Sequence, residues 1–253
     1  MVLMNTAVDK SPERVQRMFN AIAPRYDLIN RLLTLGIDSQ WRKKTARILL
    51  HNHSLKGDIL DVCSGTGELA FAFGKQLQKG QLQKGQLPRT CFGIDFSQEM
   101  IAVAQRKEAR KKSGNTNLYF SVADALKLPF DDNRFAVVAV AFGLRNIGNT
   151  EQGLDEMVRV CKPGGIVAVL EFSMPTLPIV RQCYRFYFRT FLPCLGQWFA
   201  KNQDKAYHYL PESVLQFDSP GQLAERLTQL GLADIQMKPM TCGIASLIWG
   251  RKP

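Results

Sequence analysis

The feature that most constrains the fold of this chain is a regular alternation of short apolar segments with longer amphipathic ones. The apolar segments are rich in β-branched residues, as buried parallel strands are, and occupy residues 58–62, 90–95, 117–122, 135–142 and 165–171. Between them, residues 67–78, 97–112 and 150–161 are predicted helices. Such an alternation predicts a doubly wound α/β sheet.

Further predicted elements flank this alternating region. Before it, residues 11–22, 26–35 and 38–50 are predicted helices. After it come a helix at 219–230 and strands near 232–238 and 243–250. Too few residues separate these two strands for a crossover helix, so they must pair antiparallel.

We interpret the chain as a single domain with four parts. These are an N-terminal helical cap (1–55), a cofactor-binding core (56–175), a helical aromatic insertion or lid (176–216), and a C-terminal helix with antiparallel strands (217–253). Within the core, the tandem repeat QLQKG at 76–80 and 81–85 is predicted to be a surface-loop insertion, because the entropy of loop closure grows slowly with length.

The loop after the first core strand, in ILDVCSGTGELA (59–70), indicates the kind of cofactor. Its Gly65-to-Ala70 segment fits the dinucleotide fingerprint G-x-G-x-x-G/A. However, Asp61 and Glu68 lie beside the turn and would repel a pyrophosphate. S-adenosylmethionine has no phosphate, and a carboxylate can attract its sulfonium and ammonium groups. The loop therefore favours S-adenosylmethionine.

Two more acids follow strands in the same way. Asp95 ends the second strand, where its carboxylate can accept hydrogen bonds from ribose hydroxyls. Asp124 follows the third strand and can accept from an adenine amino group, while Ala125 offers a backbone N–H to a ring nitrogen. One such acid could simply cap the next helix. Three such acids, in chain order and each at the end of a strand, predict a pocket for S-adenosylmethionine.

The segments DVCSGTGELA, GIDFSQEM, ADALKLPF and VCKPGG resemble the successive motifs of class I S-adenosylmethionine-dependent methyltransferases. The resemblance implies a seven-stranded, mostly parallel sheet with the last strand antiparallel. We expect cofactor contacts from Asp61, Gly65, Thr66, Gly67, Asp95, Phe96, Asp124, Ala125 and Ala141. Ala141 stands where the family often has a serine, so a hydroxyl contact is not available there.

Three further segments, at 26–43, 141–165 and 170–175, resemble the ubiquinone/menaquinone biosynthesis C-methyltransferase family, as does the C-terminal end. The resemblance implies methylation of a ring carbon of a polyprenylated quinol, and we expect demethylmenaquinol as the acceptor. Alternatives are a ubiquinone-precursor benzoquinol or a natural-product small molecule. A nicotinamide-dependent reductase and a non-catalytic basic scaffold are hypotheses of other classes.

Four residues are candidates for the chemistry on the acceptor. Arg145 and Asn146 follow the fourth strand, at the edge where ligands bind in such sheets. Arg145 would stabilise phenolate charge, and Asn146 would orient a ring oxygen. Tyr26 and Asp27 could fold over the same edge, with Asp27 as the base. The simpler interpretations are an ion pair for Arg145 and packing for Tyr26.

The net charge and one aromatic segment indicate which partners the protein could bind. The net charge of +11 suggests an anionic partner, but the basic residues are spread along the chain, so we expect no nucleic acid. Residues 177–199 combine aromatic side chains with arginines at four-residue spacing, as in a helix at a lipid interface. A lid, a subunit contact and a core helix are the alternatives.

Localisation is predicted from what the sequence lacks. It has no apolar run of ~18 residues and no apolar signal region at its start. Its six cysteines are scattered, as reduced thiols of a cytoplasmic protein are. We expect a cytoplasmic protein, peripherally associated with the membrane and able to form a homodimer, and no metal, because its histidines have no clustered Cys or carboxylate partners.

Overall fold

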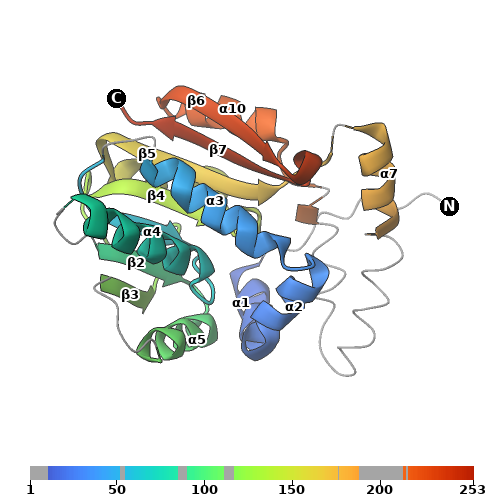
Figure 1. Cartoon of the computed structure of the whole chain (residues 1–253), viewed down its shortest axis with the longest axis horizontal. Coiled ribbons are helices and arrows are strands. Elements are labelled where there is room, and N and C mark those ends of the chain that lie inside the picture. The colour runs from blue at the N-terminus through green and yellow to red at the C-terminus, as the bar shows by residue number, and fades with distance from the viewer. Residues whose placement is uncertain are drawn as a thin grey trace.

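The computed structural model describes residues 11–51, 55–84, 90–110, 117–175, 177–187, 213–214 and 216–253. Seven strands form one sheet in the order β3-β2-β1-β4-β5-β7-β6 (Figure 1). The strands are β1 (Ile59–Val62), β2 (Thr90–Asp95), β3 (Asn117–Val122), β4 (Phe135–Ala141), β5 (Cys161–Phe172), β6 (Ala233–Met240) and β7 (Ala245–Arg251).

The pairing of the strands confirms the predicted fold class. Strands β1 to β5 pair in parallel, whereas β7 runs antiparallel to both β5 and β6. The central strands β1 and β4 are buried along almost their whole length, because helices cover both faces of the sheet. The edge strand β3 alternates exposed and buried residues over its first four positions.

Two helical layers sandwich the sheet. Helices α3 (Ile37–His51), α4 (Glu68–Lys84) and α5 (Gln98–Ala109) supply buried residues to the hydrophobic core on one face. Helices α6 (Thr150–Val160) and α10 (Pro220–Gln229) pack on the other. Figure 1 shows α3 and α4 in front of the sheet. The predicted α10 begins with a capping box between Ser219 and Gln222, which satisfies backbone donors of its first turn.

The tandem QLQKG repeat does not form the predicted loop. Helix α4 continues to Lys84, so nearly all of the duplicated segment is helical, and the prediction of a loop insertion was wrong. Gln, Leu and Lys are strong helix formers, and one interior glycine, Gly80, costs only about 1 kcal/mol. The duplication therefore lengthens a helix.

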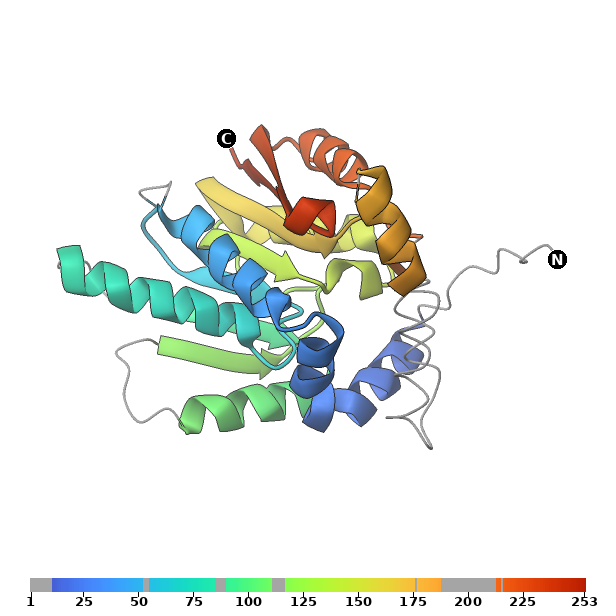
Figure 2. The same ribbon diagram turned by 45° about the vertical axis from the view of Figure 1, so that its right-hand side comes forward.

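The N-terminal helices lie over the carboxyl edge of the sheet. They are α1 (Pro12–Ile22), a 3₁₀ turn η1 (Ala23–Arg25) and α2 (Tyr26–Leu33), followed by α3. The Gln16 side chain donates to the carbonyl of Phe96 at 3.0 Å, and the Ser97 hydroxyl donates to Asn20 at 2.6 Å. Figure 2 shows α1 and α2 beside the start of α5. These bonds hold the helical cap against the end of β2.

The aromatic segment 177–199 is described only as far as Tyr187, and the predictions for Arg189 and beyond lie outside the described residues. Its first part forms helix α7 (Pro178–Phe186). The Tyr187 hydroxyl donates to the carbonyl of Leu33 at 2.7 Å, so the end of α7 lies against the end of α2.

Candidate active site

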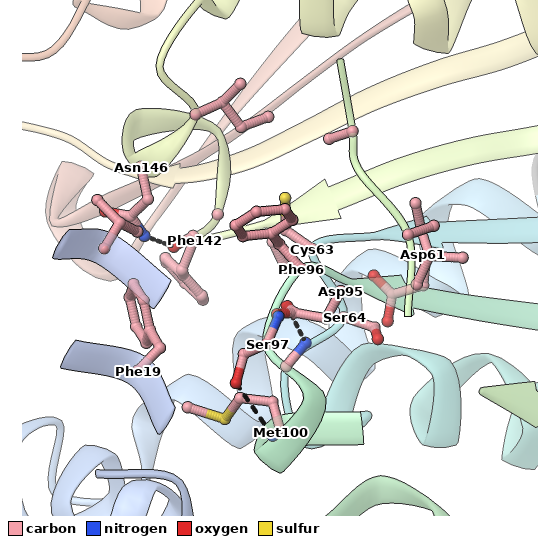
Figure 3. Close-up of a pocket in the computed structure, with 18 of the residues that line it drawn as sticks. Phe19, Asp61, Cys63, Ser64, Asp95, Phe96, Ser97, Met100, Phe142 and Asn146 are labelled. Atoms are coloured by element: carbon pink, nitrogen blue, oxygen red, sulfur yellow. Dashed lines mark hydrogen bonds between the residues drawn. The ribbon is translucent and has the colours of Figure 1, made fainter. Parts of the chain in front are cut away.

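A pocket opens at the carboxyl ends of β1 to β4, between the sheet and the N-terminal helices. It encloses about 1110 Å³ of empty space, a figure that includes the solvent at its open mouth. Figure 3 shows Phe19 of α1 in the same part of the view as Phe142 and Asn146, with Asp61 across from them. Asp61 and Asp95 project from the strand ends deeper in the pocket.

The loop after β1 is shaped by its glycines. Gly65 and Gly67 both adopt positive φ, at +53° and +86°. A Cβ atom at Gly67 would lie 2.8 Å from the Phe120 ring, so a larger residue does not fit there. The backbone N–H of Gly65 donates to Asp95 at 2.8 Å and ties the loop to β2. Gly65 and Thr66 line the pocket, whereas Gly67 shapes the loop from behind.

Asp61 presents a buried carboxylate to this pocket. One oxygen, Oδ2, accepts from the backbone N–H of Ala70 at 2.9 Å, and Oδ1 has no partner among the described residues. Burial raises the pKa of Asp61 to about 8, although the Ala70 N–H and the charge of Arg42 act in the opposite direction. A buried, unpartnered carboxylate oxygen is unfavourable, and a cationic ligand group would satisfy it.

Asp95 and Asp124 line the pocket further along the sheet edge. The two oxygens of Asp95 accept from the backbone N–H groups of Gly65 and Ser97, each at 2.8 Å, and burial raises its pKa. Each oxygen keeps a lone pair for a ligand hydroxyl. Asp124 accepts from the N–H of Leu126 at 2.9 Å, and Ala125 is buried beside it. Phe96 and Ala141 complete the predicted lining.

The charges of the pocket fit S-adenosylmethionine better than a dinucleotide. Among the described lining residues, four are acidic and one is basic, in the order Arg42, Asp61, Glu68, Asp95 and Asp124. A pyrophosphate brought against this set would be repelled. The same carboxylates can attract the cationic groups of a ligand and accept hydrogen bonds from its ribose hydroxyls.

Of the four predicted catalytic residues, two line the pocket and two do not. Tyr26 and Asn146 line the pocket, whereas Asp27 and Arg145 do not. Asp27 accepts from the Thr66 hydroxyl at 2.5 Å and forms an ion pair with Lys107. The Asp27 carboxylate therefore connects α2 to the glycine loop. Asp27 would have to break its ion pair with Lys107 before it could act as a base.

Arg145 is buried beneath the pocket wall. Its Nη1 lies 2.8 Å from Glu171 Oε2 and donates to the carbonyl of Phe142 at 2.7 Å. Its guanidinium also lies 5.3 Å from the centre of the Phe172 ring. These contacts hold the turn from Phe142 to Asn146 in place. A direct contact with the acceptor would require the buried guanidinium to move, because Arg145 does not line the pocket.

Sequence reasoning did not assign a role to several lining residues, among them Phe19, Arg42, Ser97 and Phe142. Phe142 is a non-glycine residue with φ of +61° directly after β4, which turns its ring towards Trp41 of α3. Arg42 lies within a predicted helix. No local sequence pattern indicates that the start of this helix lies close to the end of β4.

Two kinds of feature are absent from the residues that the structure describes. No three His, Cys, Asp or Glu side chains there gather into a group that could hold a metal ion. Within the same residues, no helix combines the length and apolar character needed to cross a membrane.

Comparisons with known proteins identify relatives over nearly the whole chain. A model of the ubiE/COQ5 methyltransferase family matches residues 7–252. The ubiquinone/menaquinone biosynthesis C-methyltransferase UbiE of Geobacter sp. (strain M21) is 40% identical over 247 residues, covering 97% of this chain and 99% of that protein. The demethylmenaquinone methyltransferase of Halalkalibacterium halodurans is 37% identical over 241 residues, covering 95% and 93%.

Solved structures agree on the fold. A SAM-dependent methyltransferase from Aquifex aeolicus superposes with a TM-score of 0.54 at 18% identity, covering 81% of this chain and 88% of that one. At this identity the likeness concerns the fold alone.

Proposed function

The chain belongs to the ubiE/COQ5 methyltransferase family, and we propose that it methylates a ring carbon of a polyprenylated quinol with S-adenosylmethionine as methyl donor, converting demethylmenaquinol to menaquinol. The observation that carries the proposal is the acidic pocket at the carboxyl edge, with the unpartnered oxygen of Asp61 on its wall. A ubiquinone-precursor benzoquinol is the second candidate acceptor, because the UbiE relatives carry both quinones in their name.

The pocket residues fall into two groups by the part of the reaction that they serve. Asp95, Asp124 and Ala125 hold the adenosine part of the donor, and Asp61 attracts its cationic end. Bound S-adenosylmethionine supplies an electrophilic methyl group on a sulfonium. The remaining requirement is to hold a ring carbon of the acceptor in line with that methyl, which provides much of the rate enhancement.

The acceptor ring would lie between α1 and the turn after β4. Phe19 and Tyr26 pack edge-to-face with ring centres 6.1 Å apart and offer an apolar wall. Phe142 and Asn146 also line the pocket, and the side-chain amide of Asn146 can orient a quinol oxygen. In this proposal Arg145 positions the turn that carries both residues through the carbonyl of Phe142.

A competition experiment tests donor and acceptor together. The purified protein receives methyl-labelled S-adenosylmethionine and equal amounts of demethylmenaquinol and a ubiquinone-precursor benzoquinol. We expect the label in the naphthoquinol. Label in the benzoquinol would favour the second candidate, and label in neither quinol would contradict the proposed function.

We also propose that the protein contacts an anionic lipid surface through the ends of α2 and α7. Leu35 follows α2, and Ile179 and Phe186 lie near the start and at the end of α7; these residues expose 86%, 79% and 67% of their surface. The exposed Arg31 and Arg181 lie on the same two helices. Apolar side chains edged by arginine favour anionic lipid headgroups. The predicted homodimer has no support from the described residues and stays a prediction.

Replacing both Leu35 and Ile179 by aspartate should weaken binding to vesicles of anionic lipid by about tenfold or more, because apolar burial is lost and charge repulsion is added. Co-sedimentation with vesicles measures this. Met237→Asp is the matched control, since this exposed apolar residue lies on the edge strand β6. Equal binding by the double variant and the control would refute the lipid contact.

A further inference from the structure

Arg42 is the one basic residue among the described side chains that line the pocket. Resting on the proposed function, we infer that Arg42 binds the carboxylate of the methionyl part of S-adenosylmethionine. The donor carries a sulfonium, an ammonium and a carboxylate. The four acidic side chains of the pocket suit the two cationic groups, and they would repel the carboxylate unless a cation met it.

The position of Arg42 along the sheet edge matches this role. Asp95 and Asp124 place the ribose and adenine sites at the ends of β2 and β3, which leaves the ends of β1 and β4 for the methionyl part. The Arg42 guanidinium lies there, 5.0 Å from the centre of the Phe142 ring. It is also close enough to Asp61 for its charge to lower the pKa of that carboxyl, against the larger effect of burial.

The neighbouring residue anchors this part of α3. Trp41 is buried, and its Nε1 donates to the Thr241 hydroxyl at 2.8 Å. Its ring packs against Phe142 and Phe172 with centres 6.0 and 6.1 Å away. The backbone that carries Arg42 is thus fixed to the turns after β4 and before β7.

A second carboxylate orients the guanidinium from behind. Arg42 Nη1 donates to Asp38 Oδ2, one helical turn earlier, and the Thr34 hydroxyl donates to Asp38 Oδ1 at 2.8 Å. Arginine has five N–H donors, and Asp38 is its one hydrogen-bond partner among the described residues. The remaining donors can form a charge-assisted, two-point contact with a ligand carboxylate. Asp38 and Thr34 are positioning residues.

The alternative is that Arg42 serves only as an intrahelical ion pair with Asp38. The two interpretations differ in ligand selectivity. If Arg42 forms only a structural ion pair, its replacement should change the affinity for all ligands equally. If Arg42 binds a carboxylate, its replacement should weaken only the ligands that have a carboxylate.

Calorimetry with two ligands tests the inference on the unmodified protein. Decarboxylated S-adenosylmethionine keeps the sulfonium, the ammonium and the adenosine, and lacks only the carboxylate. We expect S-adenosylmethionine to bind about 10- to 100-fold more tightly, the range for a hydrogen bond to a charged group. Equal affinities for the two ligands would overturn the inference without any variant.

Variants then assign the selectivity to Arg42. Arg42→Gln should weaken S-adenosylmethionine about 10- to 100-fold and change the decarboxylated ligand by less than about threefold. Arg42→Lys should keep part of the selectivity. Arg47→Gln is the matched control, because Arg47 is exposed on the same helix, and it should change neither affinity.

The outcomes separate this inference from the proposed function. An equal loss of both ligands in Arg42→Gln would assign Arg42 a structural role and overturn the inference alone. If the unmodified protein binds neither S-adenosylmethionine nor S-adenosylhomocysteine, the proposed function fails and the inference falls with it.

Discussion

Arg145→Ala is expected to destabilise the folded protein by about 3–5 kcal/mol and to abolish methyl transfer, because it leaves the buried Glu171 without its partner. Both side chains of the pair expose only 6% and 2% of their surface. The same change removes the donor to the Phe142 carbonyl and so loosens one wall of the pocket. Urea unfolding measures the loss of stability through its midpoint.

A double replacement separates the ion pair from its surroundings. Arg145→Leu combined with Glu171→Leu removes both buried charges, and it should be less destabilised than Arg145→Ala. Asp132→Ala is a useful comparison, since the Asp132 side chain is 68% exposed and its ion pair with Arg159 lies near the surface, where such pairs contribute about 0–1 kcal/mol. An Arg145→Ala protein as stable as the unmodified one would refute the structural role.

Kinetics decide how Arg145 contributes to the reaction. If it positions Phe142 and Asn146, Arg145→Lys should lower kcat and raise KM together, without moving the pH dependence of kcat. If it contacts the phenolate directly, the limb of the pH profile that reports ionisation of the quinol should shift. The present geometry predicts the first result.

Asp61→Asn is expected to weaken binding of S-adenosylmethionine about 10- to 100-fold while making the protein without ligand more stable in alkaline solution. Burial raises the pKa of Asp61 to about 8 in the folded protein, against 3.8 as its ordinary value. A raised pKa means that the folded state favours the protonated acid. This contribution to stability is present below about pH 4 and is lost as the pH rises through about 8.

Thermal unfolding over a range of pH measures this effect. The asparagine variant cannot ionise, so its advantage in Tm should widen from about pH 4 to about pH 8 and then level off, reaching several degrees. Asp132→Asn, which replaces an exposed carboxylate outside the pocket lining, is the comparison variant. A variant that binds the donor normally, with a Tm difference that does not depend on pH, would contradict the role of Asp61.

Local sequence patterns were enough to predict most of the fold. The strand and helix positions follow from apolar periodicity and turn residues, and the structure confirms them, including the antiparallel β7. The tandem repeat was mistaken for a loop because its origin as an insertion was given more weight than the helix propensity of Gln, Leu and Lys.

The details of the site depended on contacts between distant segments, which no local pattern reports. The acids at strand ends could be placed in one pocket because parallel strands end at one edge. The pairing of Arg145 with Glu171 depends on how β4 and β5 pack, and that of Asp27 with Lys107 on how α2 docks against α5. The entry of Arg42 into the pocket likewise needs the docking of α3 on the sheet.

The most direct test of the central claim is to identify where the methyl group goes. Demethylmenaquinol carrying deuterium at its unsubstituted ring position is incubated with the protein and S-adenosylmethionine, and the product is analysed by mass spectrometry and NMR. The account predicts a new carbon–carbon bond at that position, loss of the deuterium, and both ring oxygens unmethylated. A product methylated on oxygen with the deuterium retained, or a quinol left unchanged, would contradict it.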